Sequence, residues 1–202
     1  MIRTRCRQER FLTERQFQAL AGHISEDGMA KLDAIYAKFE ALEEELARCY
    51  FLLQEKFITN PRLARFWAEA ALDELQHASI LRYCRQQQLF EIEPVDRGAA
   101  ERVDDLLDTV KSIVSNHGVT VDDAFYAALL IESSELDDTF RKLTRPMAKK
   151  HTLLYEAIRD NFQSHHDKFA EAAAEFTHDR AYVEAFRAFA RGGDRECCGK
   201  DC

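Results

Sequence analysis

Acidic and histidine side chains interrupt the apolar stripes of four expected helices, and their residue types could together ligate a metal ion. The interrupting residues are Glu43, Glu74, His77, Glu132 and His165. Burying several ionisable groups in one helical core is unfavourable unless an ion or a partner charge compensates them. Carboxylate and imidazole groups are common ligands of transition metals. The sequence therefore predicts a metal site inside a helical protein.

Glu74 and His77 form a Glu-x-x-His pair. Residues three apart on a helix project from the same face, so this carboxylate and this imidazole can point into one cavity. In carboxylate-bridged di-iron and di-manganese bundles, two helices each contribute one Glu and two contribute a Glu-x-x-His pair. One such pair is complete in this chain.

The fourth segment departs from that pattern. His165 is present, but Phe162 stands three residues before it, where a second pair would have its carboxylate. Taking Gln163 and His166 as the pair restores two polar groups, but it moves both off the inward stripe. We therefore expect Phe162 and His165 to face inward, at a site that holds two ions, one ion or none.

The four segments are expected to be helices because their apolar residues are spaced alternately three and four apart. The stripes run over 32–57, 63–84, 125–143 and 151–176. Asn60 before Pro61, and Thr120 before two aspartates, predict two of the helix starts. The long connection before Thr120 contains helically spaced apolar residues, and it could run the length of a bundle.

Residues 25–178 resemble the ferritin-like superfamily, and within it the rubrerythrin-type branch. Three motifs carry the resemblance: a Glu followed seven residues later by Tyr (Glu43, Tyr50), a Glu-x-x-His (Glu74, His77), and a Glu-x-x-Glu that some rubrerythrins use (Glu132, Glu135). The resemblance implies an all-α, ferritin-like four-helix bundle with one long crossover connection and short flanking helices.

The resemblance also implies the metal ligands and the metal. The implied ligands are Glu43, Glu74, His77, Glu132, Glu135 and His165. Such oxygen-rich ligation favours two iron ions or one per chain, or manganese, over structural zinc, which prefers sulfur and nitrogen. No separate cofactor site and no catalytic residue is assigned.

Two functions remain open. The first is a rubrerythrin-like oxidoreductase that acts on peroxide, dioxygen or ferrous iron. Rubrerythrins carry a further iron site built from two Cys-x-x-Cys pairs, which this chain lacks, so the electrons would come from an external donor or from the substrate. The second is a non-catalytic scaffold with a degenerate or mononuclear site. Phe162 favours the scaffold, and Glu135 favours the enzyme because it could supply the missing carboxylate.

The expected organisation has four parts: an N-terminal extension with a short helix over 1–24, the bundle over 25–178, a C-terminal helix over 179–191, and a flexible cysteine-rich tail over 192–202. Cys49 and Cys84 are expected to be buried or half-buried thiols. Three further thiols, Cys197, Cys198 and Cys202, could bind a soft metal, deliver a metal, exchange disulfides or have no role.

Composition limits the partners. The formal net charge of −8 and the pI near 5.4 argue against a nucleic-acid partner, which would favour a basic face. No apolar run reaches the length of a membrane span, so we expect a cytoplasmic protein without a membrane partner. A homodimer is a further expectation from the resemblance.

Overall fold

The computed structural model describes residues 26–90 and 98–192 of the 202-residue chain. Every regular element in these ranges is a helix, which confirms the predicted all-α class. The helices are α2 (Glu26–Lys56), α3 (Pro61–Gln86), α4 (Ala99–Ser115), α5 (Val121–Glu132), α6 (Glu135–Thr144), α7 (Met147–Lys150), α8 (Thr152–Phe176) and α9 (Arg180–Gly192). None of these helices has the length and apolar composition that crossing a membrane requires.

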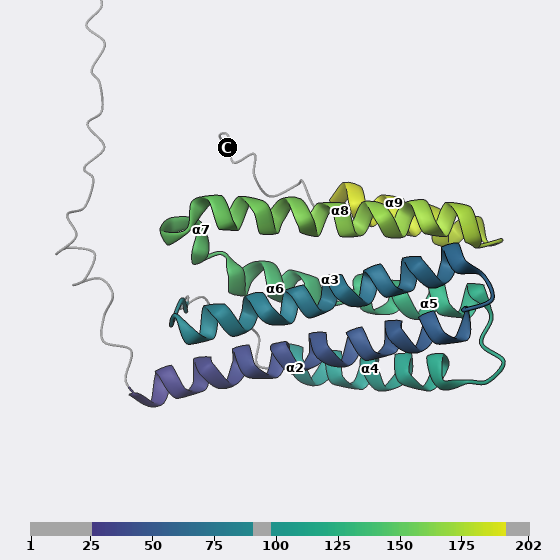
Figure 1. The fold of residues 1–202 in the computed structure, drawn as a ribbon. Coiled ribbons are helices and arrows are strands. Elements are labelled where there is room, and N and C mark those ends of the chain that lie inside the picture. Colours follow the sequence, from purple (N-terminus) through teal and green to yellow (C-terminus); the bar gives the residue numbers. More distant parts are fainter. Residues whose placement is uncertain (1–25, 91–97, 193–202) are drawn as a thin grey trace, which may run out of the picture.

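The helices lie in three layers (Figure 1). The first layer contains α2 with α4 beside it, the second contains α3 with α5 and α6, and the third contains α8 with α9 folded back along it. Successive long helices run in opposite directions, with α5 and α6 together forming one length of the middle layer. A residue at the middle of α3 therefore lies between the first and third layers.

Two helix starts agree with the predictions from the sequence. Asn60 caps α3, where its side chain accepts a hydrogen bond from the backbone N–H of Leu63. Thr120 and Asp123 form a reciprocal capping box at the start of α5. These caps begin the two helices that carry Glu74 and Glu132.

The third predicted segment is not one continuous helix. It breaks between α5 and α6, where the Ser133 hydroxyl donates to the carbonyl of Leu129 at 2.6 Å and the Ser134 hydroxyl accepts from the Leu136 N–H at 3.2 Å. Serine side chains compete for backbone groups in this way, so a pair of them favours a helix end and a new cap. Glu132 is consequently the last residue of α5.

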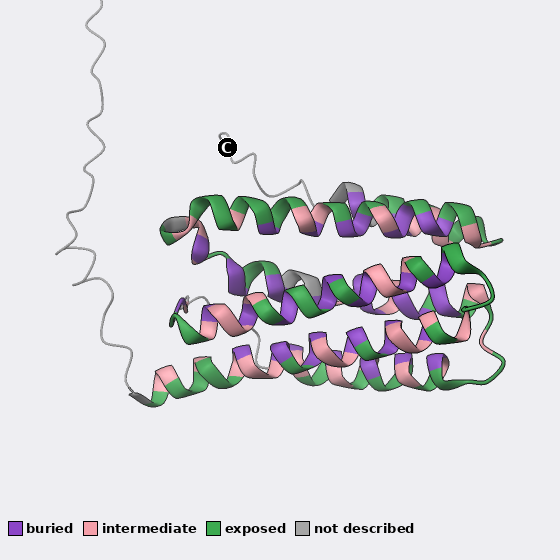
Figure 2. Ribbon diagram, viewed as in Figure 1, coloured by how far each residue is buried: buried purple, intermediate pink, exposed green. Residues whose placement is uncertain are grey.

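The apolar stripes face inward in the structure (Figure 2). Tyr36, Trp67 and Phe169 are almost completely buried, and together with other stripe residues they belong to one continuous apolar core. Cys49 and Cys84 are buried free thiols, as predicted, and burial raises their pKa to about 11 and about 12.

Several predictions concern residues outside the described ranges. They are the short N-terminal helix, the tail over 193–202 with its three cysteines, and the segment over 91–97 that leads into α4. The described part of the connection between α3 and α5 is helical, since α4 occupies most of it.

Candidate metal centre

Five of the six predicted ligands come together in the middle of the molecule. Glu43 comes from α2, Glu74 and His77 from α3, Glu132 from α5 and His165 from α8. Each has between 1% and 3% of its surface exposed. The cluster therefore draws on all three layers, and it lies in a medium where an uncompensated charge is strongly disfavoured.

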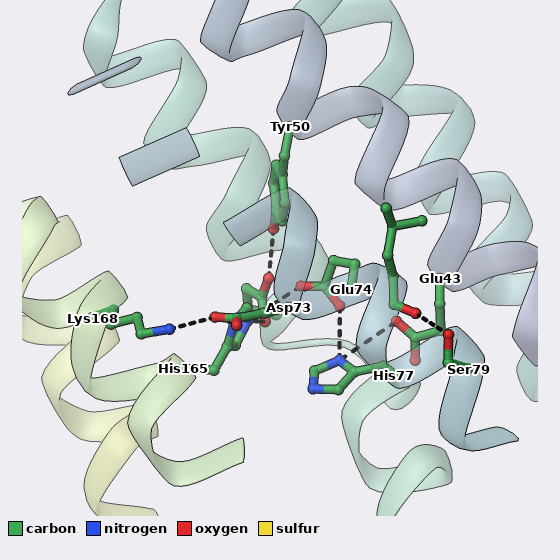
Figure 3. Close-up of polar contacts among 10 residues, drawn as sticks. Glu43, Tyr50, Asp73, Glu74, His77, Ser79, His165 and Lys168 are labelled. Carbon is green, nitrogen blue, oxygen red and sulfur yellow. Dashed lines mark hydrogen bonds and ion pairs between the residues drawn. The ribbon is translucent and has the colours of Figure 1, made fainter. Parts of the chain in front are cut away.

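The cluster consists of two groups that share one carboxylate (Figure 3). Glu43, Glu74 and His77 form the first group, and Glu74, Glu132 and His165 form the second. In each group the three ligand atoms lie within 4.8 Å of one another. Glu74 can therefore offer one oxygen to each side, which is the arrangement that a bridging carboxylate requires.

In the first group, His77 faces both acids with the same ring nitrogen. Its Nδ1 lies 2.9 Å from Oε2 of Glu74 and 3.9 Å from Oε2 of Glu43. The contact with Glu74 arises within one turn of α3, whereas the contact with Glu43 depends on how α2 packs against α3.

In the second group, His165 lies between two acids from other helices. Its Nε2 is 3.2 Å from Oε1 of Glu74 and 3.2 Å from Oε2 of Glu132. The other oxygen of Glu132 accepts a hydrogen bond of 2.5 Å from the hydroxyl of Tyr50. Tyr50 thereby holds the Glu132 carboxylate with one oxygen directed at His165.

Asp73 and Lys168 extend this group toward the surface. The Nδ1 of His165 lies 3.2 Å from Oδ2 of Asp73, and the Lys168 ammonium donates to the same oxygen at 2.7 Å. A carboxylate at Nδ1 keeps a proton there, so Nε2, which faces the acids, is the nitrogen that could ligate a metal, an arrangement typical of histidines that ligate metals. Neither residue is among the ligands predicted from the sequence, although Asp73 adjoins Glu74 and Lys168 lies one turn after His165.

The electrostatics of the second group fit a cation site. Burial disfavours the charged form of His165, but Glu132, Glu74 and Asp73 outweigh it and raise its pKa well above its ordinary value. Burial likewise opposes ionisation of Glu132, and His165 nevertheless holds the pKa of this carboxyl below its ordinary value. Without a metal, a proton on His165 balances part of the acid charge, and a metal ion would replace that proton.

An aromatic wall bounds the cluster where a second Glu-x-x-His would place its carboxylate. The Phe162 ring stacks nearly parallel on Phe140, with centroids 5.6 Å apart, and it lies 5.6 Å from the ring of His77. The predicted inward orientation of Phe162 and His165 agrees with their burial. At this level α8 offers an apolar ring and no carboxylate.

His166 is also buried, contrary to the expectation that it lies off the inward stripe. Its ring contacts Phe162, with centroids 4.5 Å apart. The adjacent Gln163 donates to the carbonyl of Ala190 in α9. Because α8 packs against α3 on one side and α9 on another, more than one of its faces is covered.

Glu135, the sixth predicted ligand, begins α6, but its side chain lies outside the described part of the structure. Its predicted role as a ligand is therefore untested. Among the described residues, the buried Glu and His side chains could hold a metal ion, with three carboxylates and two imidazoles as donors. Hard oxygen ligands predominate in this donor set, and no thiolate takes part among the described residues.

Comparison of the chain with family models, with curated proteins and with solved structures found no match. The resemblance to ferritin-like proteins therefore stays a prediction from the sequence.

Proposed function

We propose that this chain is a ferritin-like metalloprotein that binds two iron or manganese ions in its core and acts as an oxidoreductase on peroxide, dioxygen or ferrous iron. The observation that carries the proposal is the position of Glu74, whose two oxygens face two separate pairs of ligands. Two ions sharing one carboxylate are the hallmark of carboxylate-bridged dinuclear sites.

The arrangement of the helices supports the proposal. In a ferritin-like bundle, two antiparallel helix pairs are joined by one long crossover connection. Here α2 with α3, and α5–α6 with α8, would be the two pairs, and α4 would be the crossover. The directions of the helices in Figure 1 are compatible with this topology.

Each ligand would then have a defined task. Glu43 and His77 would hold one ion, Glu132 and His165 would hold the other, and Glu74 would bridge the two. Burial of all five side chains excludes bulk water from the ligand atoms.

Two neighbouring residues would position the second pair of ligands. Asp73 fixes the ring of His165 by accepting from its Nδ1, and Tyr50 fixes the carboxylate of Glu132. Mutating residues that orient metal ligands in this way typically lowers metal affinity by roughly ten- to a hundredfold.

When bound, two iron or manganese ions would supply two electrons, one from each ion, which together with two protons reduce one peroxide to two water molecules. Regeneration would take electrons from an external donor or from the substrate, since the sequence has no Cys-x-x-Cys pairs. The cytoplasmic location and the homodimer stay predictions.

Phe162 favours a second candidate, a non-catalytic ferritin-like scaffold with a single ion. The site lacks the second carboxylate that α8 would otherwise provide, and the aromatic wall of Phe162 and Phe140 fills that position. An asymmetric centre could bind one ion firmly in one group and leave the other group without one.

Anaerobic loading with ferrous iron followed by mixing with peroxide separates the two candidates. The oxidoreductase predicts about two ions per chain and repeated peroxide consumption when a reductant is supplied, both lost in Glu74→Ala. Metal binding without metal-dependent turnover would support the scaffold. Absence of any ion that depends on Glu74 would refute both.

A further inference from the structure

The buried ligands raise the question of how an ion reaches them. His165 has 1% of its side chain exposed, whereas Asp73 has 12% and Lys168 has 38%. Exposure therefore increases stepwise along the hydrogen-bonded series from His165 to Lys168. Figure 3 shows Lys168 joined to Asp73 by a hydrogen bond, on the side away from Glu74 and His77.

Lys168 lines a surface groove of about 330 Å³ between α3 and α8. Two ion pairs lie along this groove, Arg62 with Glu175 at 2.8 Å and Arg65 with Glu69 at 2.7 Å. Each arginine in the groove is thus neutralised by a neighbour. The ammonium of Lys168 differs, because its partner Asp73 lies on the side of the metal centre.

Asp73 lies between Lys168, which lines the groove, and His165, a ligand of the second group. Oδ2 of Asp73 lies 2.7 Å from the Lys168 ammonium and 3.2 Å from the Nδ1 of His165, whose Nε2 faces Glu74 and Glu132. If the ammonium moves aside, this carboxylate becomes accessible to a cation in the groove. Asp73 contacts His165, so an ion held there would lie one side chain away from the second group of ligands.

Glu171 is placed where it could serve as a second partner for Lys168. It lies three residues later on α8, lines the same groove, and is exposed. Residues three apart on a helix can form an ion pair. Lys168 could therefore exchange Asp73 for Glu171 without losing an ion pair. Movement of the Lys168 side chain between these two partners would require little free energy, and it would uncover or cover Asp73.

We propose that divalent cations enter the metal centre through the groove between α3 and α8, with Asp73 as a transient ligand and Lys168 as the gate. The inference rests on the proposed function, because it assumes that the buried cluster binds metal. It concerns the rate of metal uptake and leaves the number of bound ions unchanged.

In the test, the metal-free, full-length protein is mixed with Co²⁺ in a stopped-flow instrument. Metal uptake is monitored as quenching of the fluorescence of Trp67, the single tryptophan. Lys168→Met removes the ammonium but keeps a long side chain, and it should speed uptake about two- to fivefold, the range set by a partly exposed ion pair. Glu171→Gln removes the alternative partner and should slow uptake by a similar factor.

Arg62→Met is the matched control, because Arg62 lines the same groove but pairs with Glu175 instead of Asp73. Its uptake rate should equal that of the unmodified protein. Equilibrium dialysis should give the same number of Co²⁺ ions for all four proteins.

Equal uptake rates in Lys168→Met, Glu171→Gln and the unmodified protein, with full Co²⁺ content in each, would overturn the entry route and leave the proposed function intact. A lack of Co²⁺ binding in the unmodified protein would overturn the proposed function, and the entry route with it. If Lys168→Met failed to fold, the exposed Glu171→Gln substitution would still decide the question.

Discussion

Because Glu74 belongs to both ligand groups, its loss should remove more metal than the loss of Glu43, another buried glutamate of the cluster. Glu43 and Glu74 are each 2% exposed, and both contact His77. Glu43 belongs to one ligand group only, whereas Glu74 belongs to both. Glu43→Ala should therefore remove one ion, and Glu74→Ala should leave each group with two ligands and remove both ions.

The expected rise in melting temperature can be estimated, because an ion that binds only the folded state stabilises that state. An ion present at a hundredfold excess over its dissociation constant stabilises the folded state by about 2.7 kcal/mol. In a domain of this size, 1 kcal/mol shifts the melting temperature by roughly 2–4 °C. Each bound ion should therefore raise the melting temperature by about 5–11 °C.

The assay is thermal unfolding followed by circular dichroism, with and without Mn²⁺, which stays divalent in air. Comparing each variant with its own metal-free form cancels the effect of the substitution on the metal-free protein. The Mn²⁺-induced rise should be largest for the unmodified protein, about half as large for Glu43→Ala, and near zero for Glu74→Ala. Glu69→Ala, on the exposed side of α3, is the control and should behave as the unmodified protein. Equal rises for Glu43→Ala and Glu74→Ala would refute the sharing of Glu74.

Three further predictions concern the residues around the bridge. Burial lowers the pKa of His165, but Glu132 and the other acids outweigh it and raise that pKa. The contribution of His165 to the stability of the metal-free protein should therefore be fully present below the unfolded-state value of about 6.5 and be lost as pH rises through the raised pKa. Urea titrations should show this loss, and His165→Gln should lack it. Asp73→Asn should weaken Mn²⁺ binding roughly ten- to a hundredfold in calorimetric titrations, and unchanged affinity would contradict the role of Asp73 in orienting His165. Phe162→Glu should destabilise the metal-free protein by roughly 3–5 kcal/mol or more, as loss of a buried Phe ring does. Mn²⁺ should restore much of that lost stability. Phe162→Leu adds no ligand, so Mn²⁺ should stabilise this variant no more than it stabilises the unmodified protein.

Local signals in the sequence were sufficient to predict most of the helices and the types of side chain in the buried cluster. Stripe spacing indicates which side of a helix is buried, and an Asn or Thr cap followed by its partner residues indicates where the helix begins. Glu74 and His77 could be paired without a structure, because residues three apart share a face on any α-helix. The sequence does not predict the break at Ser133, because the apolar stripe continues across it and gives no sign of the two serine side-chain hydrogen bonds.

Contacts between helices were decided only by the tertiary structure. Periodicity sets the direction of a side chain around its own helix axis, but it does not set which helix lies opposite or at what height along it. The second oxygen of Glu74 meets His165 across 91 positions of the chain, and Lys168 meets Asp73 across 95. Those pairings depend on how α8 packs on α3, which results from the summed packing of the whole core. The sequence thus determined which groups could bind a metal, and the packing of three helical layers determined that one carboxylate stands between two sets of ligands.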